Sequence, residues 1–413
     1  MPAMSAALKG FLWLWLPMLA LLLAGVWRAW STGQADPWDW GIAAAILLAG
    51  AGLLLARCGR LALAWVAVGA AGPALIFCAL AAAQTPPAGA SLGLVAIALL
   101  AVFGGAWLRQ PPPVEFRPVP VRMKGGWPGR GIGAFLLALS ALLIWRGPAQ
   151  PIAAAPDRPK LAVLTALPLF WVEPGQAGNG PRDAPIVTVL RTRFAVEPLD
   201  DPLQLASSGA RALLVAQPRA LTPEQLVAID DWVRAGGTAL ILADPLLRWP
   251  STLPLGDRRR PPSAGLLGPL LAHWGFAPGL LVDQESRHFT ADGHLLTLSG
   301  AWMFDGAAMQ RKRLGRGEAL LLGDADLIDD RLWLADPARP LDPRGWVADT
   351  PALIADWLGA PISGERRWMR TPHDVIAGLR WAILVGTGWA MLGTMLLRRN
   401  FAHGRSEQKV KIT

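Results

Sequence analysis

Cysteine is scarce in this sequence. The 413 residues include two cysteines, Cys58 and Cys78, and both lie in or beside long apolar runs. The more polar middle of the chain therefore has no cysteine with which to build a disulfide, a thiolate nucleophile or a cysteine-ligated metal site. This scarcity excludes the cysteine-dependent classes of chemistry from that region.

A nucleotide-binding P-loop is also missing. Such a loop needs G-x-x-x-x-G-K-[ST], because backbone N–H groups and the lysine together hold the phosphates. No Gly-Lys-Ser or Gly-Lys-Thr occurs, and the glycine-rich segment 125–130 lacks both the lysine and the hydroxyl. If the protein takes part in ATP-driven transport, another chain must hydrolyse the ATP.

Charged residues are few and unevenly placed. They make up 17% of the chain against 53% hydrophobic residues, and the net charge is +9. Residues 160–360 hold 19 basic and 23 acidic residues, so the rest of the chain carries a net charge of +13. A basic excess beside apolar runs is typical of membrane topology, and we therefore expect a lipid bilayer and no nucleic acid as the partner of these segments.

Six apolar runs approach the roughly 20 residues that a helix needs to cross a bilayer. The second and fifth are short. Tryptophans lie near the ends of several runs, as they do at membrane interfaces. The six predicted spans are residues 11–30, 41–56, 61–83, 92–108, 132–145 and 375–397.

Loop charges predict the orientation of these spans. Basic residues gather at 57–60, at 109–130 and in the tail 398–413, whereas the connection 84–91 is uncharged. Positive loops stay in the cytoplasm, which predicts a bacterial inner-membrane protein with both termini cytoplasmic and residues 160–360 extracytoplasmic, in the periplasm of a Gram-negative cell. Three arginines disagree, because they would lie just outside the last span: Arg366, Arg367 and Arg370.

The region 160–360 has the pattern of an α/β domain. Residues 212–216 and 238–243 are short apolar runs, and between them Thr222-Pro223 begins an amphipathic segment that Gly236-Gly237 ends. Strand, helix and strand within about thirty residues form a βαβ unit with parallel strands. Further strands are predicted at 160–168, 194–197, 280–283, 294–298 and 318–323, and further helices at 184–192, 265–274 and 352–358. The fold class is thus a multi-pass α-helical membrane protein with an inserted soluble α/β domain, whose sheet is open and mostly parallel.

Ligands of open α/β sheets bind outside the carboxyl ends of the strands. The polar residues at those positions are Gln217, Asp244, Asp324 and Asp326, which we therefore predict to line a ligand crevice. For each of them taken singly, capping of a helix or turn is the competing interpretation.

Two segments contain oxygen or nitrogen ligands for a metal. Asp324 and Asp326, followed by Asp329 and Asp330, offer carboxylates that suit Ca²⁺ or Mg²⁺, but their spacing does not match the EF-hand loop. His288 and His294 lie among acids, but a zinc site needs three converging ligands and two histidines across a hairpin rarely converge. We therefore predict no metal, cofactor or catalytic residue.

Three segments together resemble the gliding-motility-type ABC-transporter auxiliary family (GldG-like). They are LLVAQPRALTPEQLVAIDDWVRAGGTALILADP (213–245), GRGEALLLGDADLIDD (315–330) and ALIADWLG (352–359). The resemblance covers residues 160–359. It implies an extracytoplasmic domain with a flavodoxin-like sheet, similar in fold to class I glutamine amidotransferases. It also implies that the protein works together with a separate ATPase. Amidotransferase activity is not implied, because Asp244-Pro245 stands where the nucleophile would be and no cysteine follows residue 78.

The sequence therefore favours a non-enzymatic auxiliary or permease-like subunit of an ABC-type transport system. Its expected partners are a separate ABC ATPase and a second permease. The alternative is a membrane-anchored, metal-dependent enzyme of the cell envelope that uses the Asp324/Asp326 or His288/His294 cluster.

Overall fold

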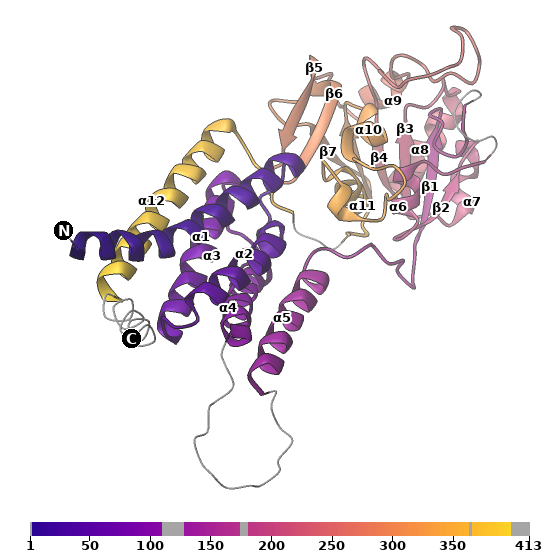
Figure 1. The fold of residues 1–413 in the computed structure, drawn as a ribbon. Helices are drawn as coiled ribbons and strands as arrows, with labels where there is room; N and C mark the ends of the chain where they lie inside the picture. The colour runs from indigo at the N-terminus through magenta and orange to yellow at the C-terminus, as the bar shows by residue number, and fades with distance from the viewer. Residues whose placement is uncertain (1, 110–127, 174–180, 363–365, 398–413) are drawn as a thin grey trace, which may run out of the picture. The chain divides into compact units, whose positions relative to one another are not determined.

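A computed structural model describes residues 2–109, 128–173, 181–362 and 366–397. The chain divides into two compact units, one formed by residues 1–148 with 365–413 and the other by residues 149–364. Each unit is considered separately below, and Figure 1 labels their elements.

The first unit is built of long apolar helices. Its elements are α1 (Pro2–Thr32), η1 (Pro37–Trp40), α2 (Gly41–Leu55), α3 (Arg60–Ala81), α4 (Ala88–Arg109), α5 (Pro128–Arg146) and α12 (Pro372–Leu396). Within the described residues, five segments are long and apolar enough to cross a membrane: 7–32, 37–55, 60–81, 88–109 and 372–396. The predicted span 132–145 forms α5, which is not among these five.

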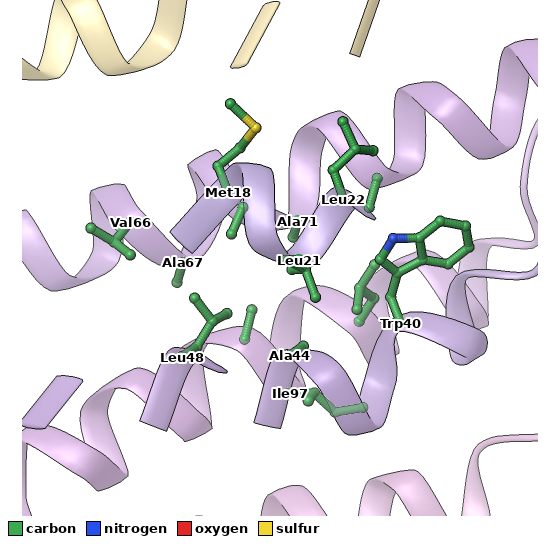
Figure 2. Packing of buried hydrophobic residues seen from close by; sticks show 14 of the residues in the cluster. Met18, Leu21, Leu22, Trp40, Ala44, Leu48, Val66, Ala67, Ala71 and Ile97 are labelled. Carbon is green, nitrogen blue, oxygen red and sulfur yellow. The ribbon is translucent and has the colours of Figure 1, made fainter. Parts of the chain in front are cut away.

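Small residues let these helices approach closely. Leu21, Trp40, Ala44, Leu48 and Ala67 are fully buried at the junction of α1, η1, α2 and α3 (Figure 2). Between α2 and α4 the backbones themselves touch: a Cβ added at Gly52 would lie 2.0 Å from the carbonyl oxygen of Val102. Close packing of backbones through glycine is the usual way in which helices associate in lipid, where no hydrophobic effect drives them together.

The pattern of these contacts gives the direction of each helix. Gly41 lies beside Ile97 and Gly105 beside Ala49, so α2 and α4 run parallel. Gly104 lies beside Leu137, while Gly133 lies beside Leu108, so α5 runs antiparallel to α4.

The helix α12 runs antiparallel to α3. Gly378 lies beside the backbone of Phe77, Gly386 beside Pro73 and Gly393 beside Trp65. Backbone hydrogen bonds also join three connections at one end of the unit, from Ala35 N to Arg367 O, from Met369 N to Gly33 O and from Arg370 N to Ala81 O. The chain that precedes α12 is thus fixed to the α1–η1 and α3–α4 connections.

The second unit is an α/β domain around a six-stranded sheet. The strand order is β2-β1-β3-β4-β8-β7, in which β7 alone is antiparallel to its neighbour. The order of the five parallel strands is that of flavodoxin-like sheets. Their bounds are β1 (Lys160–Thr165), β2 (Ala195–Pro198), β3 (Ala212–Ala216), β4 (Thr238–Leu242), β7 (Met309–Leu314) and β8 (Gly317–Leu322).

Helices and turns connect these strands. They are α6 (Pro185–Leu190), η2 (Pro202–Gln204), α7 (Leu205–Ser208), α8 (Pro223–Arg234), α9 (Gly268–His273), η3 (Asp326–Ile328), α10 (Asp330–Trp333), η4 (Pro343–Gly345) and α11 (Thr350–Trp357). Alternate strand residues, among them Leu213, Ala239 and Leu321, pack in one cluster with Ile229 and Val233 of α8. The two-residue period of the strands and the helical period of α8 thus meet in one apolar layer.

The start of α8 follows the predicted signal. Thr222 accepts a hydrogen bond from the backbone N–H of Gln225, and the Gln225 side chain accepts one from the backbone N–H of Thr222. This capping box satisfies two backbone donors that have no partner inside the helix. The predicted βαβ unit is therefore present, and so is the fold class as a whole.

Two features of the domain differ from the sequence-based expectation. Strands β5 (Leu280–Phe289) and β6 (Leu295–Met303) form the expected hairpin, but they are longer than expected and make a sheet separate from the main one. Strand β7, MQRKRL, was not expected, because its charges hide the alternation of an exposed edge strand. Charged residues on an edge strand hinder pairing with other chains.

Candidate functional site

The four polar residues predicted at the strand ends lie together. Gln217 follows β3, Asp244 follows β4 by two residues, and Asp324 and Asp326 follow β8. Parallel strands end at the same edge of a sheet, which places these residues side by side. Gln217, Asp244 and Asp324 are 0% exposed and Asp326 is 1% exposed, so they lie beneath the surface and no open crevice exposes them.

Gln217 holds the start of the loop that follows β4. Its Oε1 accepts a hydrogen bond from Asp244 N at 2.9 Å, and its Nε2 donates to the carbonyl oxygens of Asp244 and Pro262. Its backbone has φ +42°, a left-handed conformation that is uncommon for residues other than glycine. The side-chain amide is thus committed to closing the base of the loop 245–264.

The carboxylates of Asp244, Asp324 and Asp326 form one group. One oxygen from each carboxylate lies within 4.8 Å of the other two. Among the described residues, these three side chains are the group of acids, histidines or cysteines that lie close enough together to hold one metal ion. Asp244 Oδ1 accepts a hydrogen bond from Leu246 N and its Oδ2 accepts from Ala325 N. Asp324 accepts from Ser299 N and Leu327 N. The expected capping of turns is therefore present, and it brings three acids together.

Asp326 differs from the other two acids. Its Oδ2 accepts a hydrogen bond of 2.6 Å from Arg248 N. Its Oδ1 is buried and has no hydrogen-bond partner. A buried polar atom without a partner is costly, so this oxygen is the one open position of the cluster.

Burial and mutual repulsion dominate the electrostatics of the cluster, and the charges of Arg248 and Arg331 offset them only in part. Among the described residues, no ion pair joins a basic side chain to any of the three carboxylates. Burial raises the pKa of Asp244, and burial together with the charge of Asp244 raises the pKa of Asp324 well above its usual value. Burial likewise raises the pKa of Asp326 to about 7, against the lowering effect of the Arg248 N–H. Charge repulsion and desolvation therefore act in the same direction.

The acids beyond Asp326 do not join this group. Asp329 forms an ion pair with Arg331 at 2.5 Å and accepts a hydrogen bond from the backbone N–H of that residue at the start of α10. It acts as a helix cap whose charge is already balanced. Asp330 begins α10 itself.

The histidine and acidic side chains of residues 283–294 do not converge on one point. His288 is half-buried on β5, where it pairs in register with Leu296. His294 lies before β6, with Nδ1 3.4 Å from Asp349 Oδ2. Asp283 forms an ion pair with the Arg248 guanidinium. The described part of the chain thus places no three of these groups around one point.

Glu173 is a buried acid that could not be singled out from its sequence neighbours. The residue is 0% exposed, and its side chain accepts hydrogen bonds from Ser251 Oγ, Thr252 N and Thr252 Oγ1. These partners lie 78 and 79 residues further along the chain. A single acid between apolar residues carries no local signal for such a distant partner. The basic run 258–260 lies in the same loop, where Arg259 pairs with Asp257 and Arg260 donates to Leu253 O.

The comparisons with known proteins bear on this domain. Residues 158–292 match a family model described as an ABC-type uncharacterized transport system. The match includes the first of the three segments on which the family resemblance depends, residues 213–245, and ends before the other two. It supports association of the α/β domain with transport and does not distinguish the GldG-like subtype or an amidotransferase-like fold.

No curated protein matches the chain. Among solved structures, Gan42B, a GH42 β-galactosidase, is 15% identical with a TM-score of 0.27, over 56% of this chain and 33% of its own. The exo-β-1,4-mannosidase Op5Man5 from Opitutaceae bacterium strain TAV5 is 12% identical with a TM-score of 0.27, over 57% of this chain and 40% of its own. The chain thus spans less than half the length of either enzyme. Similarity at this level carries no argument about fold or activity.

Proposed function

We propose that this protein is a non-enzymatic membrane component of an ABC-type transport system, with an outward-facing α/β domain that binds a ligand or a partner protein. The observation that carries the proposal is the family match over residues 158–292, in a chain where this domain stands between two sets of apolar helices. The GldG-like subtype, and with it a separate ABC ATPase and a second permease as partners, belongs to the same proposal.

The helix directions support six spans. Short connections at 56–59 and 82–87 reverse the chain between α2, α3 and α4, and α12 is antiparallel to α3. The helices α4 and α12 therefore run the same way, and the chain has to return across the bilayer between them. Because α5 is antiparallel to α4 and about 28 Å long at 1.5 Å per residue, it is suited to that crossing.

The orientation follows from the basic residues. Residues 57–60, the segment 109–130 and the tail 398–413 are basic, which favours both termini in the cytoplasm of a bacterial cell and residues 160–360 outside. The contrary arginines have a local role. The Arg370 guanidinium donates to the carbonyl oxygen of Ala82, which caps the C-terminus of α3. The Arg367 guanidinium donates to the carbonyl oxygen of Thr85, in the connection between α3 and α4. Their charge serves these backbone groups at one end of the helices.

Co-purification tests the proposal. The tagged full-length protein is extracted from its native membrane in a mild detergent, and the co-eluting chains are identified. We expect an ATPase with a Walker motif to co-elute, and we expect the complex to hydrolyse ATP only while that ATPase is present. Elution of the protein alone, under conditions that preserve a known ABC complex, would contradict the proposal.

Cysteine labelling tests the topology. In a background with Cys58→Ala and Cys78→Ser, the exposed Ser207→Cys reports on the α/β domain and Ser406→Cys on the tail. A membrane-impermeant maleimide added to intact spheroplasts should label the first and not the second. The reverse pattern would mean that the orientation is inverted or that α5 does not cross, and labelling of both would mean that α12 does not cross.

The alternative is a membrane-anchored, metal-dependent enzyme of the cell envelope. The convergence of Asp244, Asp324 and Asp326 favours it, whereas their burial opposes it because a substrate has no access to them. A hydrolase assay on envelope substrates with the purified protein, with and without divalent metal, separates the two. Metal-dependent turnover that is abolished by Asp326→Asn would favour the enzyme.

A further inference from the structure

We propose that the carboxylates of Asp244, Asp324 and Asp326 bind one hard divalent cation, Ca²⁺ in the first place, which fastens the carboxyl ends of β4 and β8 beneath the loop 245–264. The proposal goes beyond the transport function and does not depend on it. It assigns to the buried end of the sheet a binding site for an ion.

The donor set selects the class of ion. All three side chains offer oxygen, and no sulfur or imidazole joins them among the described residues. Hard cations such as Ca²⁺ and Mg²⁺ prefer oxygen ligands, whereas zinc and copper prefer nitrogen and sulfur. Three carboxylates around a divalent ion also leave a small net charge, which the domain interior tolerates better than three uncompensated acids.

The spacing fits the size of Ca²⁺. Ca²⁺–oxygen distances of about 2.3–2.6 Å allow two ligands of one ion to be up to about 5 Å apart. One oxygen from each of the three carboxylates lies within 4.8 Å of the other two, which is inside that span. Mg²⁺, with bonds of about 2.0–2.1 Å, allows two of its ligands a shorter span of only about 4.2 Å.

The unpartnered oxygen points to a ligand independently of the acidic composition. Asp326 Oδ1 is buried and lacks a hydrogen-bond partner, although Asp326 is 1% exposed and its other oxygen is bound by Arg248 N. Asp244 Oδ1 and both oxygens of Asp324 each accept one backbone N–H, which uses one lone pair and leaves another for a metal, whereas Asp244 Oδ2 accepts two, from Ala325 and Asp326. The backbone bonds thus orient the carboxylates, and one oxygen still requires a partner.

Enclosure restricts the occupant to the size of an ion. The three residues are at most 1% exposed, and the loop above them is closed at its base by Gln217 and by the bond from Gly265 N to Asp244 O. Asp326 also holds Arg248 N of that loop. A cation there would couple the loop to the two strands, so that its removal loosens the loop as well as the strand ends.

Calcium titration of the full-length protein tests the proposal. The detergent-purified chain is freed of metal with EDTA and titrated with Ca²⁺ by isothermal calorimetry. We expect one Ca²⁺ per chain, and a loss of affinity of about tenfold or more in Asp326→Asn and Asp244→Asn, since each removes a charged ligand. Asp231→Asn, an exposed acid on α8, is the matched control and should bind Ca²⁺ like the wild type.

Hydrogen–deuterium exchange of the wild type locates the site without any variant. Ca²⁺ should slow exchange at residues 244–248 and 323–327 and leave α8 unchanged. The absence of saturable binding up to about 1 mM Ca²⁺, the weak end of the extracellular range, would overturn the proposal. Binding that persists in both variants, or protection elsewhere in the chain, would overturn it too. Saturation by Mg²⁺ at lower concentration than Ca²⁺ would overturn the choice of calcium.

Discussion

Trp65 of α3 and Trp389 of α12 bind each other reciprocally. Their rings stack with centroids 4.1 Å apart, although 324 residues separate them in the chain. The indole N–H of Trp65 donates to Trp389 O at 3.2 Å, and that of Trp389 donates to Trp65 O at 3.0 Å. Each indole also lies against a glycine four residues beyond the other tryptophan, Gly393 and Gly69.

Loss of this pair should detach α12. In Trp389→Ala, the stacking, one indole donor and the packing against Gly69 are removed together. We expect a destabilisation of about 2 kcal/mol, below the range for a fully buried tryptophan because Trp389 is only partly buried. Unfolding of the protein in mixed detergent micelles, followed by tryptophan fluorescence, measures it. Trp381→Ala on the same helix is the control, because Trp381 is 57% exposed and should cost little.

Two glycines of α2 should respond in opposite ways to the same substitution. A Cβ at Gly52 would lie 2.0 Å from Val102 O, whereas a Cβ at Gly50 would meet nothing within 4 Å. Gly52→Ala should push α2 from α4 and destabilise the unit by about 1–3 kcal/mol, as overpacking does. Gly50→Ala should be neutral or slightly stabilising, because alanine favours the helix. Equal effects in the two variants would mean that the α2–α4 contact does not govern stability.

Acidic pH should stabilise the metal-free α/β domain. Burial raises the pKa of Asp326 from 3.8 to about 7, so between these values the folded chain holds a proton that the unfolded chain has lost. Stability from this group is therefore fully present below about pH 4 and falls as the pH rises to about 7. Thermal unfolding in EDTA across this range should show the decline, of the order of 1–3 kcal/mol.

The Asp326→Asn variant checks the assignment of that decline. Its side chain does not titrate, so the slope between pH 4 and 7 should be smaller than in the wild type. A slope unchanged by the substitution would assign the pH dependence to other groups, with Asp324 as the first to consider because burial and the charge of Asp244 raise its pKa well above the usual value.

Glu173 should prove structurally important. In Glu173→Ala, Ser251 Oγ, Thr252 N and Thr252 Oγ1 lose a buried acceptor, although Ser251 is only half-buried and Thr252 is exposed. A cost of about 1–3 kcal/mol is expected, since hydrogen bonds to a carboxylate are lost and water restores only part of them. Limited proteolysis should also show faster cleavage near residues 251–260. Glu285→Ala, at an exposed position of β5, should change neither the melting temperature nor the cleavage pattern.

The sequence predicted local features well because local chemistry dictates them. The capping box at Thr222 and the apolar runs of β3 and β4 are visible in neighbouring residues. The candidate site followed from one rule of topology, that the carboxyl ends of parallel strands meet at the same edge. Gln217, Asp244, Asp324 and Asp326 could therefore be grouped from the sequence without knowledge of their distances.

Features that depend on distant partners could not be predicted in this way. Glu173 finds its donors 78 residues away, and Trp65 finds its partner at the far end of the chain. The charges of β7 obscured its strand character, because an exposed edge needs little apolar surface. The burial of the three acids could not be predicted from the sequence either, because it depends on how the loop 245–264 folds over them.

The antiparallel pairing of α3 and α12 sets an order for biosynthesis. The groove of α3 around Gly69 and Pro73 is complete only when α12 fills it, and α12 is translated after the entire α/β domain. During that interval the nascent chain must keep a glycine-lined helix face from pairing with other membrane helices. Closure by α12 also ends a chain excursion of more than 200 residues, an entropic cost that grows only slowly with length. A ribosome stalled before residue 372 would therefore leave an open membrane bundle, available to insertases and quality-control proteases.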